Sequence, residues 1–158
     1  MYVDINIVES MSRATSVPFE TTLHVRDCCL CLHVQRAARA LARRFDEALR
    51  PIGLTNGQFS LMMSLNRPEP PGITAVATLL AMDRTTLTAA LKPLERRGLI
   101  KVAKDPSDRR SRLLSLTPDG ETLLALAVPV WEHTHRDLEV ILKDVDPDRL
   151  RSGLRALS

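Results

Sequence analysis

The side chains best suited to recognition chemistry lie in one short run, Arg84-Thr85-Thr86-Leu87-Thr88, with Lys92 one helical turn further on. An arginine can donate two hydrogen bonds to a guanine edge, and a threonine can hydrogen-bond a base or place its methyl group against thymine. A helix N-terminus also attracts phosphate. The run predicts base reading by Arg84, Thr85, Thr86 and Thr88, and a phosphate contact by Lys92. The alternative is an ordinary amphipathic helix with a polar outer face.

Basic charge is concentrated around this run. The segment from Arg84 to Arg112 carries nine basic and three acidic side chains. The whole chain of 158 residues has a net charge of only +3, so the rest of the chain is net acidic. A solvated basic face would explain this distribution. A phosphate-facing surface is favoured if the same segment has the shape of a groove reader, because phosphate contacts supply much of the affinity for DNA.

Cys28 and Cys31 are spaced three apart, which would place both on one face of a helix. One interpretation is a pair of small buried hydrophobic residues near a dimer interface, the usual environment of free cysteine. A second is a redox switch, in which Arg26 favours the reactive thiolate and oxidation alters the interface. A third is a metal site with His24 or His33, but the spacing matches no common zinc pattern.

Other chemistry is not indicated. His133 and His135 are two apart, so on a helix they would point away from each other. The sequence contains no glycine-rich phosphate loop, nucleophile elbow or paired metal-ligand motif, so we expect no enzyme, no cofactor and no metal. It also lacks a run of about 18 apolar residues, so we expect no membrane partner. The three cysteines do not form a secreted disulfide framework, and we expect a cytoplasmic protein.

The first half of the chain predicts helices that flank these residues. Residues 1–22 are polar and aperiodic, which indicates a mobile arm. Apolar residues at spacings of three and four predict a helix over 23–49 that ends before Pro51 and Gly53. Thr55 and Gln58 have the spacing of a capping box, which predicts a helix that continues to about Asn66.

The segment that contains the predicted DNA-contacting residues, 73–116, predicts two helices and a hairpin. Thr74 is the expected N-cap of a short helix over 75–81, and Asp83 the expected N-cap of a helix over 84–97 that ends before Gly98. Small residues at Ala77 and Ala81 would let these helices approach closely. Residues 99–103 and 112–116 predict the two strands of a hairpin.

The last part of the chain predicts two further helices. Thr117-Pro118 begins a helix that continues to about Lys143 and bends near Pro129. Asp146-Pro147 begins a helix to about Ala156. The expected fold is mainly α with a small β-hairpin wing: a winged helix-turn-helix on a helical scaffold. Residues 54–117 form the expected DNA-binding region.

Four stretches make the sequence resemble the MarR family of multiple-antibiotic-resistance regulators: 54–61, 82–88, 94–100 and 105–120. The resemblance implies a homodimer on a pseudo-palindromic operator in double-stranded DNA, with residues 23–53 and 118–158 as its helical dimerisation region. It also implies that Arg109 or Arg110 reaches the minor groove while Asp108 braces a wing arginine. Two positions depart from the family pattern. Ala89 stands where many relatives carry a longer residue, and Pro93 is expected to disturb the last turns of the reading helix.

The resemblance further implies a cleft for small aromatic or phenolic acids. Candidate lining residues are Phe45, Phe59, Met62, Met63 and Trp131, although most of them would equally serve as core. The expected function is that of a homodimeric repressor released by such a ligand or by cysteine oxidation. The alternative is a winged-helix module that binds protein rather than DNA.

Overall fold

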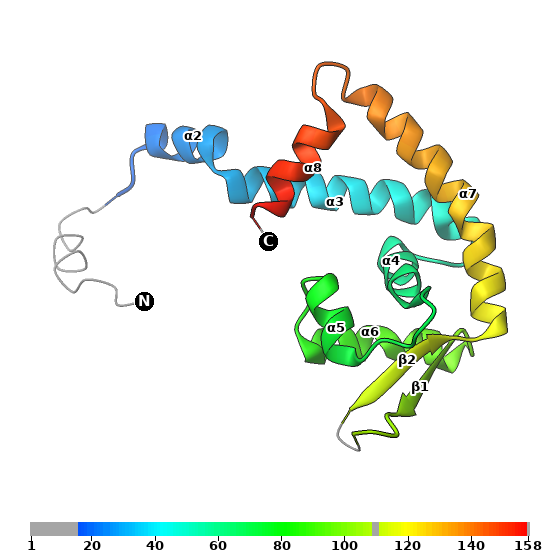
Figure 1. Cartoon of the computed structure of the whole chain (residues 1–158). Helices are drawn as coiled ribbons and strands as arrows, with labels where there is room; N and C mark the ends of the chain where they lie inside the picture. Colours follow the sequence, from blue (N-terminus) through cyan, green and yellow to red (C-terminus); the bar gives the residue numbers. More distant parts are fainter. Residues whose placement is uncertain (1–15, 109–110, 158) are drawn as a thin grey trace, which may run out of the picture. The chain divides into compact units, whose positions relative to one another are not determined.

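The computed structural model describes residues 16–108 and 111–157. The chain divides into two compact units, residues 1–40 and residues 41–158, and each is described by itself (Figure 1). Helix α3 (Leu30–Leu49) begins in the first unit and ends in the second.

The first unit contains helix α2 (Phe19–Cys28) and the N-terminal part of α3. The predicted single helix over 23–49 is wrong in two respects: helix begins at Phe19, inside the predicted arm, and it is interrupted at Cys29. Cys29 adopts an extended conformation with ψ of 104°. Its Sγ accepts the backbone N–H of Leu32 at 3.4 Å, as an N-cap side chain would, and so starts α3 afresh.

The core lies in the second unit. It joins the end of α3 to helix α4 (Asn56–Leu65), and the short 3-10 helix η2 (Arg50–Ile52) connects the two. The predicted capping box of α4 is confirmed, with Thr55 and Gln58 bonded to each other's backbone N–H groups at 3.2 and 3.1 Å. The largest fully buried side chains are Leu49, Leu61, Met62, Val76, Leu87, Leu94 and Leu114. Only 3% of the residues in the chain are aromatic, and the core is accordingly mainly aliphatic.

Helices α5 (Ile73–Leu79) and α6 (Arg84–Arg96) form a helix-turn-helix. The predicted N-cap of α5 at Thr74 is wrong: the cap is Gly72, because this segment pairs with the hairpin and the helix starts directly after it. Ala81 is exposed rather than packed between helices. Its φ of 51° is left-handed and makes the turn.

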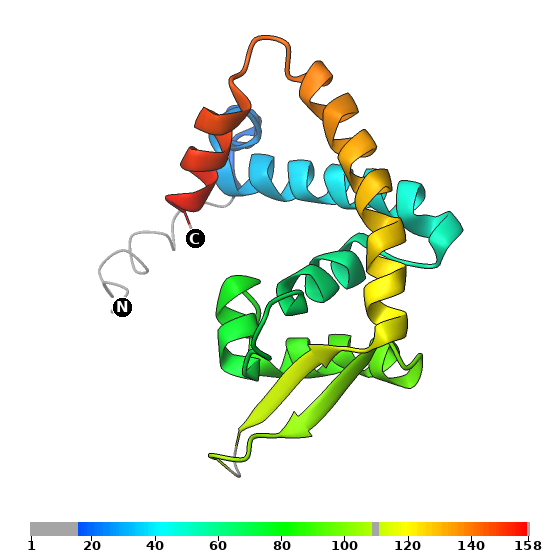
Figure 2. The ribbon, with the colours of Figure 1, turned by 45° about the vertical axis from the view of Figure 1, so that its right-hand side comes forward.

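The wing is an antiparallel hairpin of strands β1 (Ile100–Lys104) and β2 (Arg112–Leu116), seen in Figure 2. Ile100 lies opposite Leu116. A bridge between Gly72 and Leu113 and a 2.9 Å bond from Leu114 N to Pro71 O tie the hairpin to the start of α5. The hairpin is therefore fixed to the helix-turn-helix through the backbone.

Helix α7 (Pro118–Ile141) follows the hairpin, and helix α8 (Pro147–Arg155) ends the described chain. Thr117 and Asp146 are their N-caps, as predicted. Helix α7 contains Pro129 and changes direction along its length in both ribbon views, as expected (Figures 1 and 2). None of the helices within residues 16–108 and 111–157 has the length and apolar character to cross a membrane.

Candidate nucleic-acid interface

Asp83 caps the N-terminus of α6. Asp83 Oδ1 accepts the backbone N–H of Thr86 at 2.8 Å, and its Oδ2 accepts the Thr86 hydroxyl at 2.5 Å. These bonds, the hydroxyl first and the backbone N–H next, hold the pKa of Asp83 below its ordinary value. The predicted cap is thus confirmed, and it leaves Arg84 and Thr85 in the exposed first turn.

One face of α6 packs and the other is exposed. Leu87, Leu91 and Leu94 are buried in the core. All five residues assigned to DNA on this helix are exposed: Arg84, Thr85, Thr86, Thr88 and Lys92. The helical period therefore places the predicted residues on the exposed side of α6, while the buried leucines anchor the helix in the core.

Pro93 does not end the helix, which runs through it to Arg96. Proline lacks the N–H that would bond to the carbonyl of Ala89, so that carbonyl loses its helical partner. The backbone still closes the following turn, because Arg97 N donates to Pro93 O at 3.2 Å. Residues after Pro93 thus keep a helical position, contrary to the expected disturbance.

Several basic side chains of this region form no ion pair with the residues that the structure describes. Among the described residues, Arg84, Lys92, Lys101 and Lys104 make no ion pair and are exposed. Arg97 donates to the Gly53 carbonyl at 2.8 Å and pairs with no carboxylate in the described part of the chain. Lys101 and Lys104 contribute to the basic charge of residues 84–112, but the sequence alone did not predict a DNA contact for either. Their exposure adds them to the candidate surface.

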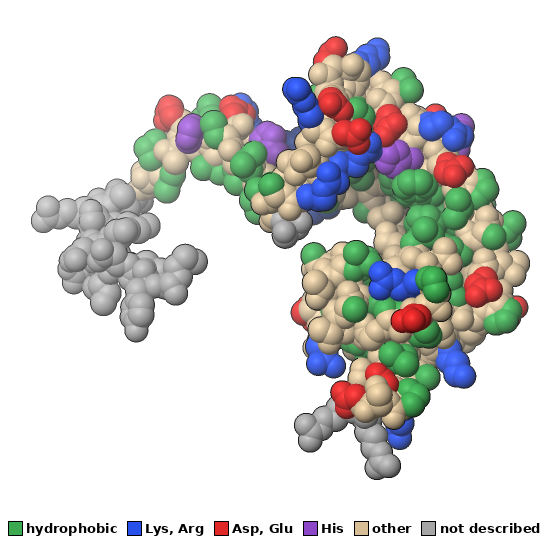
Figure 3. Space-filling model, viewed as in Figure 1, with side chains coloured by type: hydrophobic (Ala, Val, Ile, Leu, Met, Phe, Trp, Pro, Cys, Tyr) green, Lys and Arg blue, Asp and Glu red, His purple; other side chains and the backbone are tan. Residues whose placement is uncertain are grey.

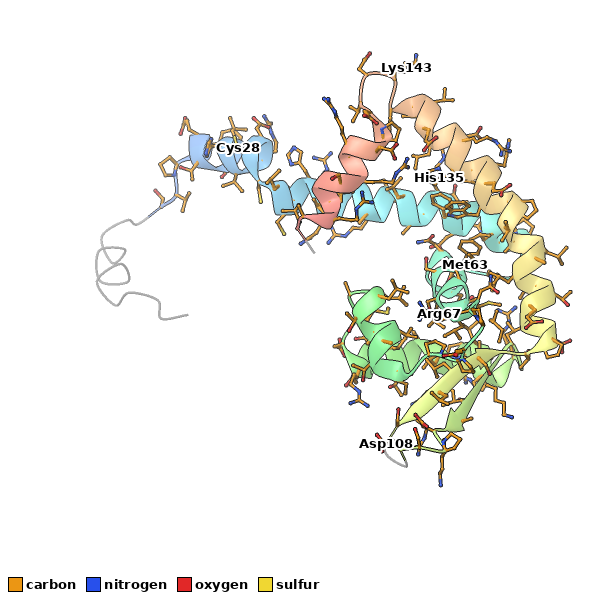
Figure 4. The ribbon with its side chains drawn as sticks, viewed as in Figure 1. Cys28, Met63, Arg67, Asp108, His135 and Lys143 are labelled. Carbon is orange, nitrogen blue, oxygen red and sulfur yellow. The ribbon has the colours of Figure 1, made fainter. Side chains whose placement is uncertain are left out.

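Asp105, which directly follows β1, binds Ser107 in the turn. Its Oδ1 accepts the backbone N–H and the hydroxyl of Ser107 at 2.8 and 2.6 Å, and these bonds lower the Asp105 pKa. Asp108 is exposed (labelled in Figure 4), and its carbonyl accepts Ser111 N–H at 2.9 Å. Arg109 and Arg110 lie outside the described residues, so their predicted contacts and the bracing role of Asp108 stay predictions.

A cavity of about 420 Å³ opens in the second unit, lined by Phe59, Ser60, Met63, Ser64, Leu79, Leu80, Val128 and Trp131. The Phe59 and Trp131 rings stack with centroids 6.1 Å apart. Met63 is 40% exposed and is labelled in Figure 4. Two predicted lining residues are placed elsewhere: Phe45 and Met62 are 7% and 0% exposed and are packed as core. Their helix faces turn inward, which periodicity alone did not resolve.

The cysteines do not share a helix face, because the break at Cys29 separates Cys28 from Cys31. Both are exposed and without a disulfide. Cys28 Sγ lies 3.6 Å from His24 Nδ1, and Cys31 Sγ accepts from Gln35 Nε2 at 3.2 Å. The supporting role expected of Arg26 is not seen. Its guanidinium is bound to Asp27 through bonds of 2.6 and 2.8 Å.

No metal cluster is formed within the described part of the chain, which includes all the cysteines and histidines. His133 and His135 each pair with a carboxylate four residues on, Asp137 at 3.6 Å and Glu139 at 3.5 Å. His135 also lies 4.9 Å from the Trp131 ring, so its environment is that of a helix surface beside the cavity (Figure 4).

A short helix, a left-handed turn, a second helix with an exposed polar face and a paired hairpin define a winged helix-turn-helix protein. The profile of the MarR family matches residues 54–111. The organic hydroperoxide resistance transcriptional regulator of Bacillus subtilis is 31% identical over 101 residues, 64% of this chain and 69% of its own length. This chain belongs to the MarR family, whose matched members are transcriptional regulators rather than enzymes.

Two further comparisons support the assignment to a family of transcriptional regulators. The transcriptional regulator HosA of Escherichia coli O111:H- is 39% identical over 81 residues, 50% of this chain, and the match spans only 58% of HosA. Among solved structures, the Mycobacterium tuberculosis regulator MOSR in complex with DNA has a TM-score of 0.73 and 35% identity, over 82% of this chain and 92% of that one. A structure with this fold therefore binds DNA.

Proposed function

We propose that this protein is a sequence-specific regulator that binds double-stranded DNA with α6 in the major groove. The observation that carries the proposal is the capped N-terminus of α6, where Arg84 and Thr85 are exposed and Arg84 makes no ion pair with the described residues. Arg84 is suited to guanine and Thr85 to a base edge. Lys92, Lys101 and Lys104 are suited to phosphate. The DNA complex of the similar MOSR supports the same partner.

The wing is the second part of this proposal. Arg109 or Arg110 would enter the minor groove, which attracts an arginine electrostatically where it is narrow. Asp108 would hold the guanidinium in place. The hairpin supports this arrangement, since the backbone bond from Leu114 to Pro71 fixes its strands to the start of α5.

A homodimer is supported by apolar side chains that lie exposed on both units. In the first unit these include Phe19, Val25 and Leu30, at 68%, 51% and 70% exposed. Figure 3 shows hydrophobic side chains on the surface of α2. In the second unit they include Val140, Ile141, Val145, Leu150, Leu154 and Leu157. Surfaces of this kind usually mark an interface. A two-fold dimer would match a pseudo-palindromic operator, on which we expect the protein to act as a repressor.

The dimer has a direct test. Sedimentation equilibrium is expected to give twice the chain mass for the wild type and a monomer for Leu154→Glu, which places a charge on the exposed face of α8. Arg149→Glu, on the same helix but 91% exposed at its side chain, is the control and should remain dimeric. A monomeric wild type would contradict the dimer.

The 420 Å³ cavity supports release by a small aromatic ligand. Its lining has no charged side chain, and its only polar side chains apart from the Trp131 indole are Ser60 and Ser64. The Ser64 hydroxyl already donates to the Leu61 carbonyl at 2.6 Å. A neutral phenol, which stacks on Trp131 and bonds to Ser60, suits this lining better than a carboxylate. Trp131 is the only tryptophan, so its fluorescence reports occupancy.

The comparison of phenol with benzoate tests the ligand class. Phenol-type ligands are expected to quench Trp131 fluorescence saturably and to weaken DNA binding, whereas benzoate is expected to do neither. Met63→Trp would fill the cavity and abolish the release from DNA. Leu126→Trp, at a 59% exposed position of α7 outside the lining, is the matched control and should keep that release. Preferential binding of benzoate would contradict the neutral-ligand proposal.

Release by cysteine oxidation is a second regulatory proposal, supported by the exposure of Cys28 and Cys31. Peroxide is expected to lower DNA affinity in the wild type, and dithiothreitol to restore it. Cys28→Ser and Cys31→Ser should lose the response. Equal DNA affinity in all these conditions would refute regulation by oxidation, and the small ligand would remain as the only proposed regulator.

Selection of bound fragments from genomic DNA tests the proposed function as a whole. A specific complex is expected, with an affinity that falls steeply with salt. Arg84→Ala should change the selected sequence, and Arg110→Ala should weaken binding. Absence of binding to any fragment would refute the proposal and favour the protein-binding alternative.

A further inference from the structure

The threonines of α6 do not all have a free hydroxyl. A threonine hydroxyl carries one hydrogen and so can donate one hydrogen bond. The Thr86 hydroxyl donates to Asp83 at 2.5 Å, and the Thr88 hydroxyl donates to the Arg84 carbonyl at 2.6 Å. Thr85 has no such bond within the described residues. Of the three, only Thr85 has a hydroxyl that can donate to a base without breaking a bond inside the protein.

The middle of the exposed face is apolar. Thr85, Ala89 and Lys92 follow one another at spacings of four and three, so they lie in one row, opposite the buried leucines. Thr88 stands beside this row and is exposed. Between Thr85 and Lys92 the row therefore offers the methyl group of Ala89, and Thr88 adds a methyl group whose neighbouring hydroxyl is already used.

We infer that Thr88 and Ala89 make the middle of α6 a reader of thymine, recognised by its 5-methyl group. In the major groove this methyl is the feature that an apolar side chain contacts. The inference rests on the proposed function, because it assumes that α6 enters the major groove. It divides the helix into a first turn that hydrogen-bonds bases and a middle turn that selects thymine by contact.

Replacement of single thymines by deoxyuridine tests this inference, since it removes the methyl and leaves base pairing intact. The probe is the fragment selected by the wild-type protein, and the measurement is fluorescence anisotropy. At one or more positions in each half-site, deoxyuridine is expected to weaken binding about fourfold, the worth of one buried methyl-sized group. At the other thymines affinity should not change.

Two substitutions at Thr88 separate its methyl from its hydroxyl. Thr88→Ser keeps the hydroxyl and is expected to lose the preference for thymine over deoxyuridine at one position. Thr88→Val keeps a methyl and is expected to retain that preference, whatever its absolute affinity. Thr122→Ser is the matched control, because Thr122 makes the same bond to the carbonyl four residues back, at 2.9 Å, on α7. It should leave the preference unchanged.

The results that overturn the inference are distinct from those that overturn the proposed function. Equal affinity for thymine and deoxyuridine at every position would refute methyl recognition while DNA binding stands. Loss of the preference in Thr88→Val but not in Thr88→Ser would show reading by the hydroxyl and refute it too. A protein that binds no DNA fragment would refute the proposed function itself.

Discussion

Gly120 is the position at which one added methyl group should do the most damage. It is buried in the first turn of α7, directly against the chain that leads into β1. A Cβ built there would lie 2.0 Å from the carbonyl oxygen of Leu99 and 3.0 Å from its carbonyl carbon. The same oxygen accepts the Thr117 N–H at 3.1 Å, and the Thr117 hydroxyl donates to the Gly98 carbonyl at 2.6 Å.

The size of the effect follows from these contacts. Carbon and oxygen normally approach to about 3.3 Å, so α7 and the β1 segment must separate by more than about 1 Å. Overpacking of this kind costs about 1–3 kcal/mol, and each weakened hydrogen bond adds about 1 kcal/mol. The better helix propensity of alanine returns about 0.5–1 kcal/mol. Gly120→Ala is therefore expected to lower the free energy of unfolding by about 2–4 kcal/mol.

Urea unfolding followed by circular dichroism measures this change. Gly57→Ala is the matched control, because Gly57 is also in the first turn of a helix and a Cβ there meets nothing within 4 Å. The control is expected to stay within about 1 kcal/mol of the wild type, on the stable side. A Gly120→Ala protein within about 0.5 kcal/mol of the wild type would refute the close approach of Leu99.

Two further predictions concern the helix-turn-helix. Ala81 has a φ of 51°, so Ala81→Gly is expected to raise the free energy of unfolding slightly and Ala81→Val to lower it, since a β-branched residue is strained there; a less stable glycine variant would contradict this. The second prediction concerns Asp83, whose pKa is lowered in the folded protein, chiefly by the Thr86 hydroxyl. Its stabilising contribution is therefore complete above the ordinary pKa of about 3.9 and is lost as pH falls through the folded pKa. Urea midpoints of the wild type should fall more steeply below about pH 4 than those of Asp83→Asn, and parallel pH profiles would contradict the bond.

The local signals of the sequence predicted most helix starts. Thr55, Asp83, Thr117 and Asp146 all cap helices as expected, because a cap bond joins residues two or three apart and depends little on the rest of the fold. The Gly72 start of α5 could not be predicted in this way. It depends on pairing with Leu113, which is distant in sequence.

The break at Cys29 was missed for a different reason. The apolar spacing continues through it, and cysteine is not a usual cap residue, so nothing in the local pattern indicated an interruption. This error also placed Cys28 and Cys31 on one face.

The sequence predicted the exposed residues of α6 better than it predicted the cavity or the bonds of the threonines. The exposure of Arg84 to Thr88 follows from the period of the buried leucines and was predictable. The cavity was predicted in part, since Phe59, Met63 and Trp131 line it as expected. Leu79 of α5 and Val128 of α7 were not identified, because these helices are far apart in the sequence and only the fold brings them together. The bonds of Thr86 and Thr88 depend on side-chain conformations that residue type alone does not fix.

The dependence of DNA affinity on salt tests the central claim, that α6 lies against DNA. A plot of log Kobs against log salt should have a steep negative slope for the wild type. Lys92→Ala should reduce the magnitude of this slope by about 0.9, because it removes the cation that neutralises one phosphate. Lys143→Ala, beyond the end of α7 (Figure 4), should leave the slope unchanged. A wild-type affinity independent of salt, or a slope that changes with Lys143 and not with Lys92, would contradict the account.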